Sequence, residues 1–218
     1  MKIFLKITAV SILLLAIVSC TEKQAGNSLL RSTPEAEGVS SQAILTFLDA
    51  AAANTDTEFH SFMFIRHGKV IAEGWWNPFA PELKHTLYST SKSFTSTAIG
   101  LAIGENKLSL DDKLISFFPE YLPDTVSENL SNVKIRDMLS MSVGQRRESS
   151  SSEAGWVKAF LETPVEYEPG SIYRYSSLAS YMLSAIVQKV TGEKVIDYLT
   201  PRLFAPLGIE GADWETSP

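Results

Sequence analysis

The chain has 218 residues, with 25 acidic and 19 basic side chains and a formal net charge of −6. This charge argues against nucleic acid as a partner, and it does not favour binding to an anionic surface. The length suits one domain, and the single cysteine excludes a disulfide within the chain.

The amino terminus has the pattern of an export signal. Lys2 and Lys6 flank the start of an apolar stretch at residues 7–18, shorter than the ~20 apolar residues that span a bilayer. The stretch ends in Ile-Val-Ser-Cys, which resembles a bacterial lipoprotein signal. We therefore expect residues 1–20 to be a lipoprotein signal in which Cys20 becomes the lipidated first residue of the mature chain, or else to remain as an uncleaved anchor. Both alternatives place the protein at a membrane of the cell envelope, outside the cytoplasm.

Residues 21–32 are polar and predict a tether, so the domain is expected to cover residues 33–218. A helix is expected near Ser41, followed by two strands at residues 61–66 and 70–76. Gly68 permits the positive φ of a hairpin between these strands. Their apolar residues stand at consecutive positions, so both faces of the hairpin require cover. Because mostly helical patterns follow, we expect an α+β fold with helices packed on a mostly antiparallel sheet.

A serine and a lysine stand three residues apart at the start of the next apolar run, as Ser89 and Lys92. Residues i and i+3 share one face of a helix, which puts the ammonium beside the hydroxyl. A lysine driven toward its neutral form by burial can take the proton of a serine nucleophile. The run predicts a buried helix, in which Gly100 and Gly104 would allow close approach of a neighbour. A helix cap with a solvated lysine is the alternative interpretation.

A second Ser-x-x-Lys is present at Ser131 and Lys134. It precedes only a short amphipathic stretch, so we expect Ser131 to be an ordinary helix N-cap and Lys134 to be solvated.

Further along the chain, a Pro-Gly turn at residues 169–170 leads through a short extended piece into a predicted helix. Tyr175 lies at the start of this helix with Ser177 two residues later, and Gly192 suits the position just after its end.

These patterns together resemble the serine β-lactamase-related hydrolases, a group that includes class C β-lactamases, DD-peptidases and 6-aminohexanoate-dimer hydrolases. Ser89-x-x-Lys92 resembles the first motif of the group, and Tyr175-Ser-Ser177 resembles its Tyr-x-Asn motif. The resemblance runs from about Ser32 to the end of the chain. It includes three further segments, at residues 108–112, 135–139 and 203–208.

The resemblance implies a β-lactamase/transpeptidase-like fold and a role for each matching residue. Ser89 would be the acylated nucleophile, with its own N–H as one oxyanion donor. Lys92 and Tyr175 would move its proton, first as general base and then as general acid. Ser177 stands where the group has asparagine for substrate binding.

The third motif of the group, a Lys or His before Thr or Ser and Gly on a late strand, is absent. We therefore expect the domain to be truncated at its C-terminal strands, and residues 21–218 alone to fold poorly and lack activity.

The expected function is that of an exported serine hydrolase acting on a small-molecule or peptide substrate through an acyl-enzyme on Ser89. Its amide or ester substrate stays open among β-lactams, D-Ala-D-Ala peptides, short esters and linear amides. The alternative is a non-catalytic lipoprotein that binds cell-wall peptides, which Ser177 and the missing third motif favour.

No cofactor and no metal are expected. Asp111 and Asp112 are interpreted as part of a helix start, and the three histidines lack the spacing of a zinc site. The serine-rich residues 149–152 predict a loop.

Overall fold

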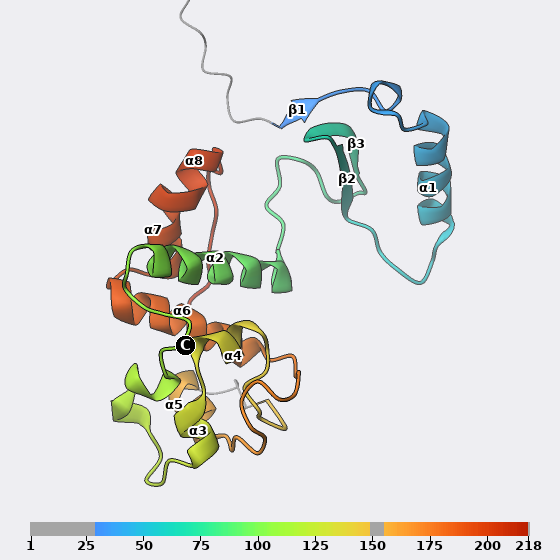
Figure 1. Cartoon of the computed structure of the whole chain (residues 1–218). Helices are drawn as coiled ribbons and strands as arrows, with labels where there is room; N and C mark the ends of the chain where they lie inside the picture. Colours follow the sequence, from blue (N-terminus) through green and yellow to red (C-terminus); the bar gives the residue numbers. More distant parts are fainter. Residues whose placement is uncertain (1–28, 149–154, 218) are drawn as a thin grey trace, which may run out of the picture.

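The computed structural model describes residues 29–148 and 155–217. Cys20, the predicted signal, most of the predicted tether and the loop at residues 149–152 lie outside this part of the chain. The described chain forms a helical body and a small sheet with one helix beside it (Figure 1). This arrangement agrees with the predicted α+β class.

The strands are β1 (Leu30–Arg31), β2 (Ser61–Arg66) and β3 (Lys69–Trp75). The α-helices are α1 (Ser41–Ala53), α2 (Ser91–Gly104), α3 (Glu128–Asn132), α4 (Ile135–Leu139), α5 (Trp156–Glu162), α6 (Ser177–Thr191), α7 (Val195–Leu199) and α8 (Ala205–Leu207). Short 3-10 helices cover Glu35–Glu37, Tyr88–Thr90, Leu114–Ser116 and Pro119–Tyr121, and a π-helical turn covers Thr200–Phe204.

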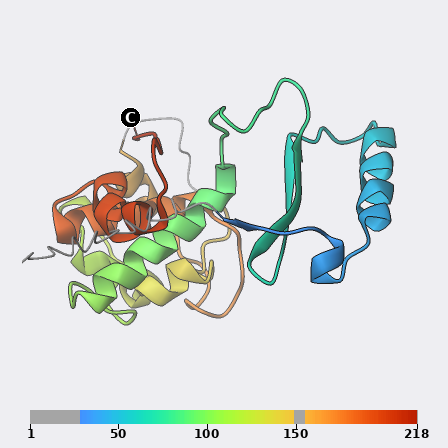
Figure 2. The ribbon, with the colours of Figure 1, turned by 90° about the horizontal axis from the view of Figure 1, so that it is seen from above.

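The hydrophobic core lies in the helical body, where α2 runs alongside α6 (Figure 1). The sheet stands between this body and α1 (Figure 2). Ala98 and Ala102 of α2 and Ile186 of α6 are fully buried in it. The helix expected after Tyr175 ends as predicted, because Gly192 follows it with a φ of 76°, in the left-handed region typical of a helix C-cap. Burial of this apolar surface is the main force that holds α2 and α6 together.

The sheet has the order β1-β3-β2, with β2 antiparallel and β1 parallel to β3. The predicted hairpin is confirmed, and both His67 and Gly68 of its turn have positive φ, at 50° and 74°. Strand β1 was not predicted, because its two residues fall inside the segment interpreted as a tether. It pairs at residues 30–31 with Lys69 and Val70 of β3.

A buried carboxylate ties the start of the domain to this hairpin. Glu37 accepts hydrogen bonds from Lys69 at 2.7 Å and from the His67 ring at 3.0 Å. These partners, Lys69 first, lower the pKa of Glu37 to about 2. A carboxyl group with a lowered pKa stabilises the fold above its ordinary pKa, and this contribution is lost as the pH falls toward 2.

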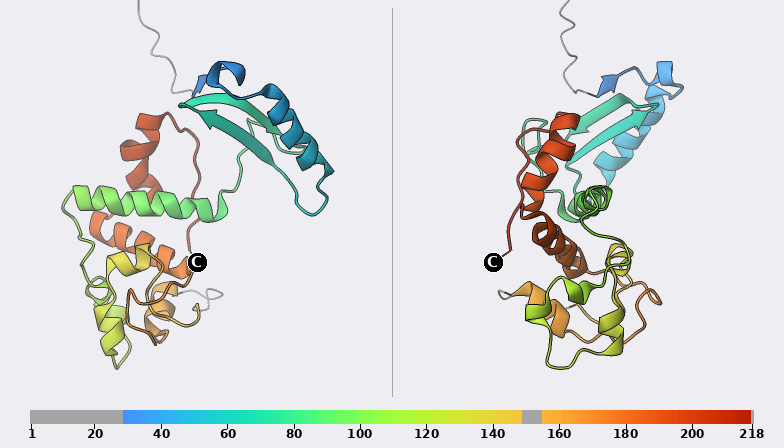
Figure 3. Two further views of the ribbon diagram at one scale, coloured as in Figure 1. Left: turned by 45° about the vertical axis from the view of Figure 1, so that its right-hand side comes forward. Right: turned by 60° about the vertical axis from the view of Figure 1, so that its left-hand side comes forward.

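The sheet and α1 stand beside the helical body in two further views (Figure 3). Several of their apolar side chains are exposed, among them Leu45 of α1 and Ile65 of β2, at 52% and 53%. The apolar side chains of α1 are therefore only partly covered, by contacts such as that between the rings of Phe47 and Phe64 at 5.2 Å.

Two local predictions were wrong. Gly100 and Gly104 contact no neighbouring element, since a Cβ at Gly100 or Gly104 would meet nothing within 4 Å. Ser109 and Asp112 do not start a helix; they close a turn in which Ser109 N–H donates to the Asp112 carboxylate at 2.8 Å.

Among the described residues, no helix is both long and apolar enough to cross a membrane.

Gly144 is the glycine whose replacement we expect to be most damaging. Its φ is 93°, and a Cβ there would lie 2.3 Å from the carbonyl oxygen of Tyr167. Gly144→Ala should therefore lower the free energy of unfolding by at least about 1–3 kcal/mol. Gly100→Ala, in an open helical position, is the matched control and should raise it by about 0.5–1 kcal/mol. Thermal unfolding of the two variants checks this, and equal effects would contradict it.

Candidate active site

Ser89 lies on a tight turn directly before α2. The 3-10 helix Tyr88–Thr90 carries it, and Tyr88 has a φ of 46°, which is uncommon for a residue other than glycine. Ser91 holds the turn by donating a hydrogen bond from its hydroxyl to the Tyr88 carbonyl. The chain therefore presents Ser89 at the junction between a strained turn and a buried helix.

Lys92 lies in the first turn of α2, as the spacing predicted. Its ammonium donates a hydrogen bond to Ser89 Oγ at 3.3 Å. Lys92 is half-buried, so its ammonium is not fully removed from water. Thr95, one turn further on, is buried and anchors this end of α2 through its contact with Ser184 of α6 at 3.4 Å.

Tyr175 belongs to a distant part of the chain and lies in the extended segment that leads into α6. Its phenol donates a hydrogen bond to Ser89 Oγ at 2.6 Å. The Lys92 ammonium lies 5.1 Å from the centre of the Tyr175 ring. The structure thus brings together the three residues that the sequence singled out, because α2 and α6 pack against each other.

The charge of Lys92 changes the acidity of the phenol. Lys92 is the largest cause of the lowered pKa of Tyr175, followed by the hydrogen bond with Ser89. A nearby cation stabilises the phenolate, so a larger fraction of Tyr175 is deprotonated at a given pH than of an ordinary tyrosine. Tyr175 remains 46% exposed, so a substrate can reach this group.

This arrangement has the parts of a nucleophile and its base. A phenolate at Tyr175 is within reach of the Ser89 proton, and a serine that loses its proton becomes a nucleophile. In the structure Ser89 Oγ accepts hydrogen bonds from both neighbours.

Ser177 is the first residue of α6, and its side chain also contributes to the lowered pKa of Tyr175. The second Ser-x-x-Lys is arranged differently. Ser131 lies inside α3 and donates to the carbonyl of Glu128, so its prediction as an N-cap was wrong. Lys134 instead precedes α4 and forms an ion pair with Asp111 at 3.0 Å.

Sequence reasoning missed two residues that contact the segment around Tyr175. Met141 accepts hydrogen bonds from the residues on both sides of Tyr175, and Glu148 accepts from the start of α6. Nothing in their local sequence distinguishes them, because their partners lie about 30 residues away. A φ of 58° at Met141 is visible only in the structure.

The structure also joins two of the three histidines. His60 Nδ1 and His85 Nε2 are 2.7 Å apart, and His85 lies on the segment that leads to Ser89. Within residues 29–148 and 155–217, no group of three or more His, Cys, Asp or Glu side chains is placed to hold a metal ion.

The family model described as Beta-lactamase matches residues 49–218. The chain is 28% identical over 195 residues to a 6-aminohexanoate-dimer hydrolase of Paenarthrobacter ureafaciens, covering 81% of this chain and 50% of that protein. It is 26% identical over 164 residues to a D-aminopeptidase of Brucella anthropi, covering 68% and 31%. The chain thus spans about a third to a half of the length of these relatives.

The fold resembles that of a solved beta-lactamase/D-alanine carboxypeptidase from Pseudomonas syringae. The TM-score is 0.61 with 20% sequence identity, and the match covers 78% of this chain and 51% of that one. This likeness confirms the predicted β-lactamase/transpeptidase-like fold.

The acidity of Tyr175 gives a direct test of the site. Lys92→Ala removes the largest cause of the lowered pKa of Tyr175, so the phenol should titrate at higher pH than in the unchanged protein. Ultraviolet absorbance of tyrosinate as a function of pH, with Tyr175→Phe as reference, measures this. Lys134→Ala is the matched control and should leave the pH at which Tyr175 titrates unchanged. An unchanged titration in Lys92→Ala would contradict the assignment.

Proposed function

Because the chain belongs to the Beta-lactamase family, we propose that it is a serine acyl hydrolase that cleaves an amide or ester bond through an acyl-enzyme on Ser89. The observation that carries the proposal is the contact of Ser89 Oγ with Tyr175 at 2.6 Å and Lys92 at 3.3 Å. The names of the two relatives, a 6-aminohexanoate-dimer hydrolase and a D-aminopeptidase, support an amide substrate.

The reaction proceeds in two halves. Tyr175 as phenolate takes the proton of Ser89, whose oxygen forms a bond to the substrate carbonyl carbon. Tyr175 then gives this proton to the leaving amine or alcohol as the carbon–leaving-group bond breaks. The Ser89 N–H is one donor to the oxyanion. In the second half, Tyr175 takes a proton from water, whose oxygen bonds to the acyl carbon. Tyr175 then returns this proton to Ser89 Oγ as the bond between Ser89 and the acyl group breaks.

Lys92 keeps its positive charge throughout this scheme. Two observations support Tyr175 rather than Lys92 as the proton acceptor. The phenol is closer to Ser89 Oγ than the ammonium is, and the pKa of Tyr175 is lowered. Ser177 is assigned to substrate binding, at the edge of the same group. The alternative of a non-catalytic protein that binds cell-wall peptides rests on this serine, which replaces the asparagine of the family motif.

The labelling of Ser89 tests the enzyme proposal. The full-length protein should be acylated once by a fluorophosphonate or penicillin probe, because Ser89 has a base within hydrogen-bond distance. Intact-mass analysis should show the added mass in the unchanged protein and lose it in Ser89→Ala. Lys92→Ala should label at least about 10-fold more slowly, because Tyr175, the base, then lacks the nearby charge that lowers its pKa.

Ser131→Ala and Lys134→Ala are the controls from the second Ser-x-x-Lys, and both should label normally. Equal labelling of the unchanged protein and Ser89→Ala would overturn the nucleophile assignment. A folded protein that binds cell-wall peptide without labelling would favour the non-catalytic alternative.

Export with lipidation at Cys20 is a separate part of the proposal, supported by the basic residues, the short apolar stretch and the single cysteine of residues 1–20. The protein made in a bacterial host should partition into detergent and gain the mass of a lipid at Cys20. Cys20→Ser should not be processed at this position. A water-soluble mature chain that starts at another residue would rule the proposal out.

A further inference from the structure

Tyr175 has no regular secondary structure of its own to hold it. It lies between the turn at Gly170 and the first residue of α6. A phenol on such a segment needs outside contacts to stay 2.6 Å from a serine hydroxyl. The contacts that hold the segment are made by the stretch from Met141 to Glu148, which follows α4.

Met141 binds the residues on both sides of Tyr175. Its carbonyl oxygen accepts a hydrogen bond from Arg174 N–H at 2.7 Å, and its Sδ accepts one from Ser176 N–H at 3.2 Å. In an extended segment, the N–H groups of residues i−1 and i+1 point the same way, and the side chain of residue i points to the opposite face from the side chains of its two neighbours. One residue therefore fixes both the position and the direction of the Tyr175 side chain.

Met141 is itself held in place by the hydrogen bonds of neighbouring residues. Ser142 N–H donates to the carbonyl of Asp137 at 2.7 Å, and Gly170 N–H donates to the carbonyl of Ser142 at 2.8 Å. Asp137 is buried in α4. Met141 has a φ of 58°, a conformation that costs free energy in a residue other than glycine and that is concentrated at functional sites. The surrounding hydrogen bonds keep it there.

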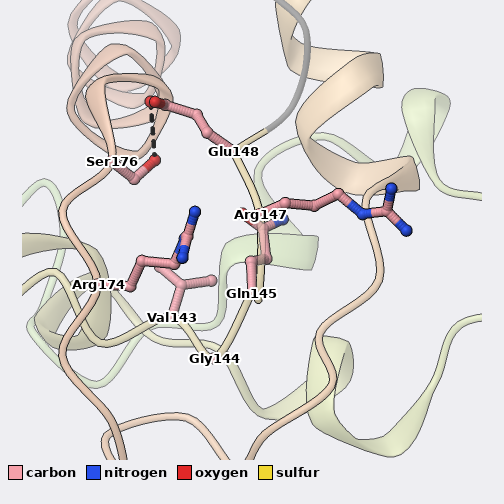
Figure 4. A pocket seen from close by; sticks show the side chains of 7 residues that line it. All are labelled: Val143, Gly144, Gln145, Arg147, Glu148, Arg174 and Ser176. Carbon is pink, nitrogen blue, oxygen red and sulfur yellow. Dashed lines mark hydrogen bonds between the residues drawn. The ribbon is translucent and has the colours of Figure 1, made fainter.

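Glu148 holds the other end of the segment. Its carboxylate accepts hydrogen bonds from Ser176 Oγ at 3.3 Å, from Leu178 N–H at 2.9 Å and from Ser177 N–H. The contact with Ser176 is drawn in Figure 4. A carboxylate at the start of a 15-residue helix satisfies free N–H groups and opposes the positive end of the helix dipole.

A small pocket lies beside this segment, lined by Gln145, Arg174 and Ser176 among others (Figure 4). Arg174 and Ser176 flank Tyr175 in the extended segment, so their side chains leave the face opposite to the phenol. The pocket therefore belongs to the support of the segment and not to the site around Ser89.

We propose that Met141 and Glu148 are positioning residues that hold the Tyr175 phenol against Ser89, with the Met141 thioether as a specific hydrogen-bond acceptor. This inference rests on the proposed function for its consequence in catalysis. The position of the Tyr175 phenol beside Ser89 can be tested without any turnover of substrate.

The central experiment compares Met141→Leu with Met141→Gln in the full-length protein. Leucine keeps the apolar volume but has no acceptor for Ser176 N–H, whereas the amide oxygen of glutamine can accept this bond. We expect Met141→Leu to lower the rate of Ser89 acylation by about 3- to 10-fold, the effect of one hydrogen bond. Met141→Gln should restore most of the rate.

The tyrosinate titration of Tyr175, read as in the previous test, is the second measurement. In Met141→Leu the phenol should titrate at higher pH, because it lies farther from the charge of Lys92. In Met141→Gln the phenol should titrate near the pH of the unchanged protein. This measurement does not need acylation. If the unchanged protein is not labelled, the proposed function fails, while the titration still decides the positioning role.

Glu148→Ala should show the same two changes as Met141→Leu, and Glu148→Gln should keep most of the unchanged behaviour, because its amide oxygen still accepts from the helix N–H groups. Glu166→Ala removes an exposed carboxylate that has no hydrogen bond among the described residues, and it is the control. Unchanged acylation and titration in Met141→Leu would overturn the proposal. Equal losses in Met141→Leu and Met141→Gln, in step with a lower melting temperature, would also overturn it, since they would show a purely structural role.

Discussion

The packing of α2 against α6 is the constraint on which the site depends. Ser89 and Lys92 belong to the amino-terminal end of α2, and Tyr175 enters directly before α6. The distance between the phenol and the serine hydroxyl is therefore set by how closely the two helices approach. Small, fully buried residues such as Ala98 and Ala102 on α2 permit a close approach, since interaxial distance follows side-chain size. A change of core volume in this contact would move the reacting groups apart.

Electrostatics supports the division of roles that we propose for Ser89, Lys92 and Tyr175. Both Lys92 and Tyr175 contact Ser89 Oγ, but the pKa of the phenol is lowered mainly by the lysine. A cation next to a weak acid favours its conjugate base. Proton acceptance therefore suits Tyr175, while Lys92 supplies a charge. This division requires only a half-buried lysine, and not the deep burial that a neutral lysine base needs.

The helical body and the sheet are stabilised by different means. The body has a continuous apolar core, whereas the sheet and α1 bury few side chains and rely partly on polar contacts such as those of Glu37. The site lies in the body, so its geometry depends on the well-packed part of the described chain. The segment 76–87 connects the two parts, and the contact between His60 and His85 bridges the start of β2 to it.

The sequence by itself determined the local secondary structure and the types of reactive side chain that are available. Apolar periodicity, Gly68 and Gly192 predicted the hairpin and the ends of α6, and the Ser-x-x-Lys spacing predicted the contact between Ser89 and Lys92. These features depend on neighbours within a few residues, which sequence patterns record well. The same patterns failed at Ser131 and Gly100, where the outcome depended on what else packs nearby.

Only the tertiary structure decided which distant groups meet. Tyr175 is 86 residues from Ser89, and a family resemblance, not spacing, suggested their contact. The hydrogen bonds of Met141 and Glu148 left no trace in the sequence, because a backbone N–H group can donate to any acceptor that the fold brings within reach. Strand β1 was missed for the same reason: two residues in a polar segment become a strand only when the exposed edge of β3 pairs with them.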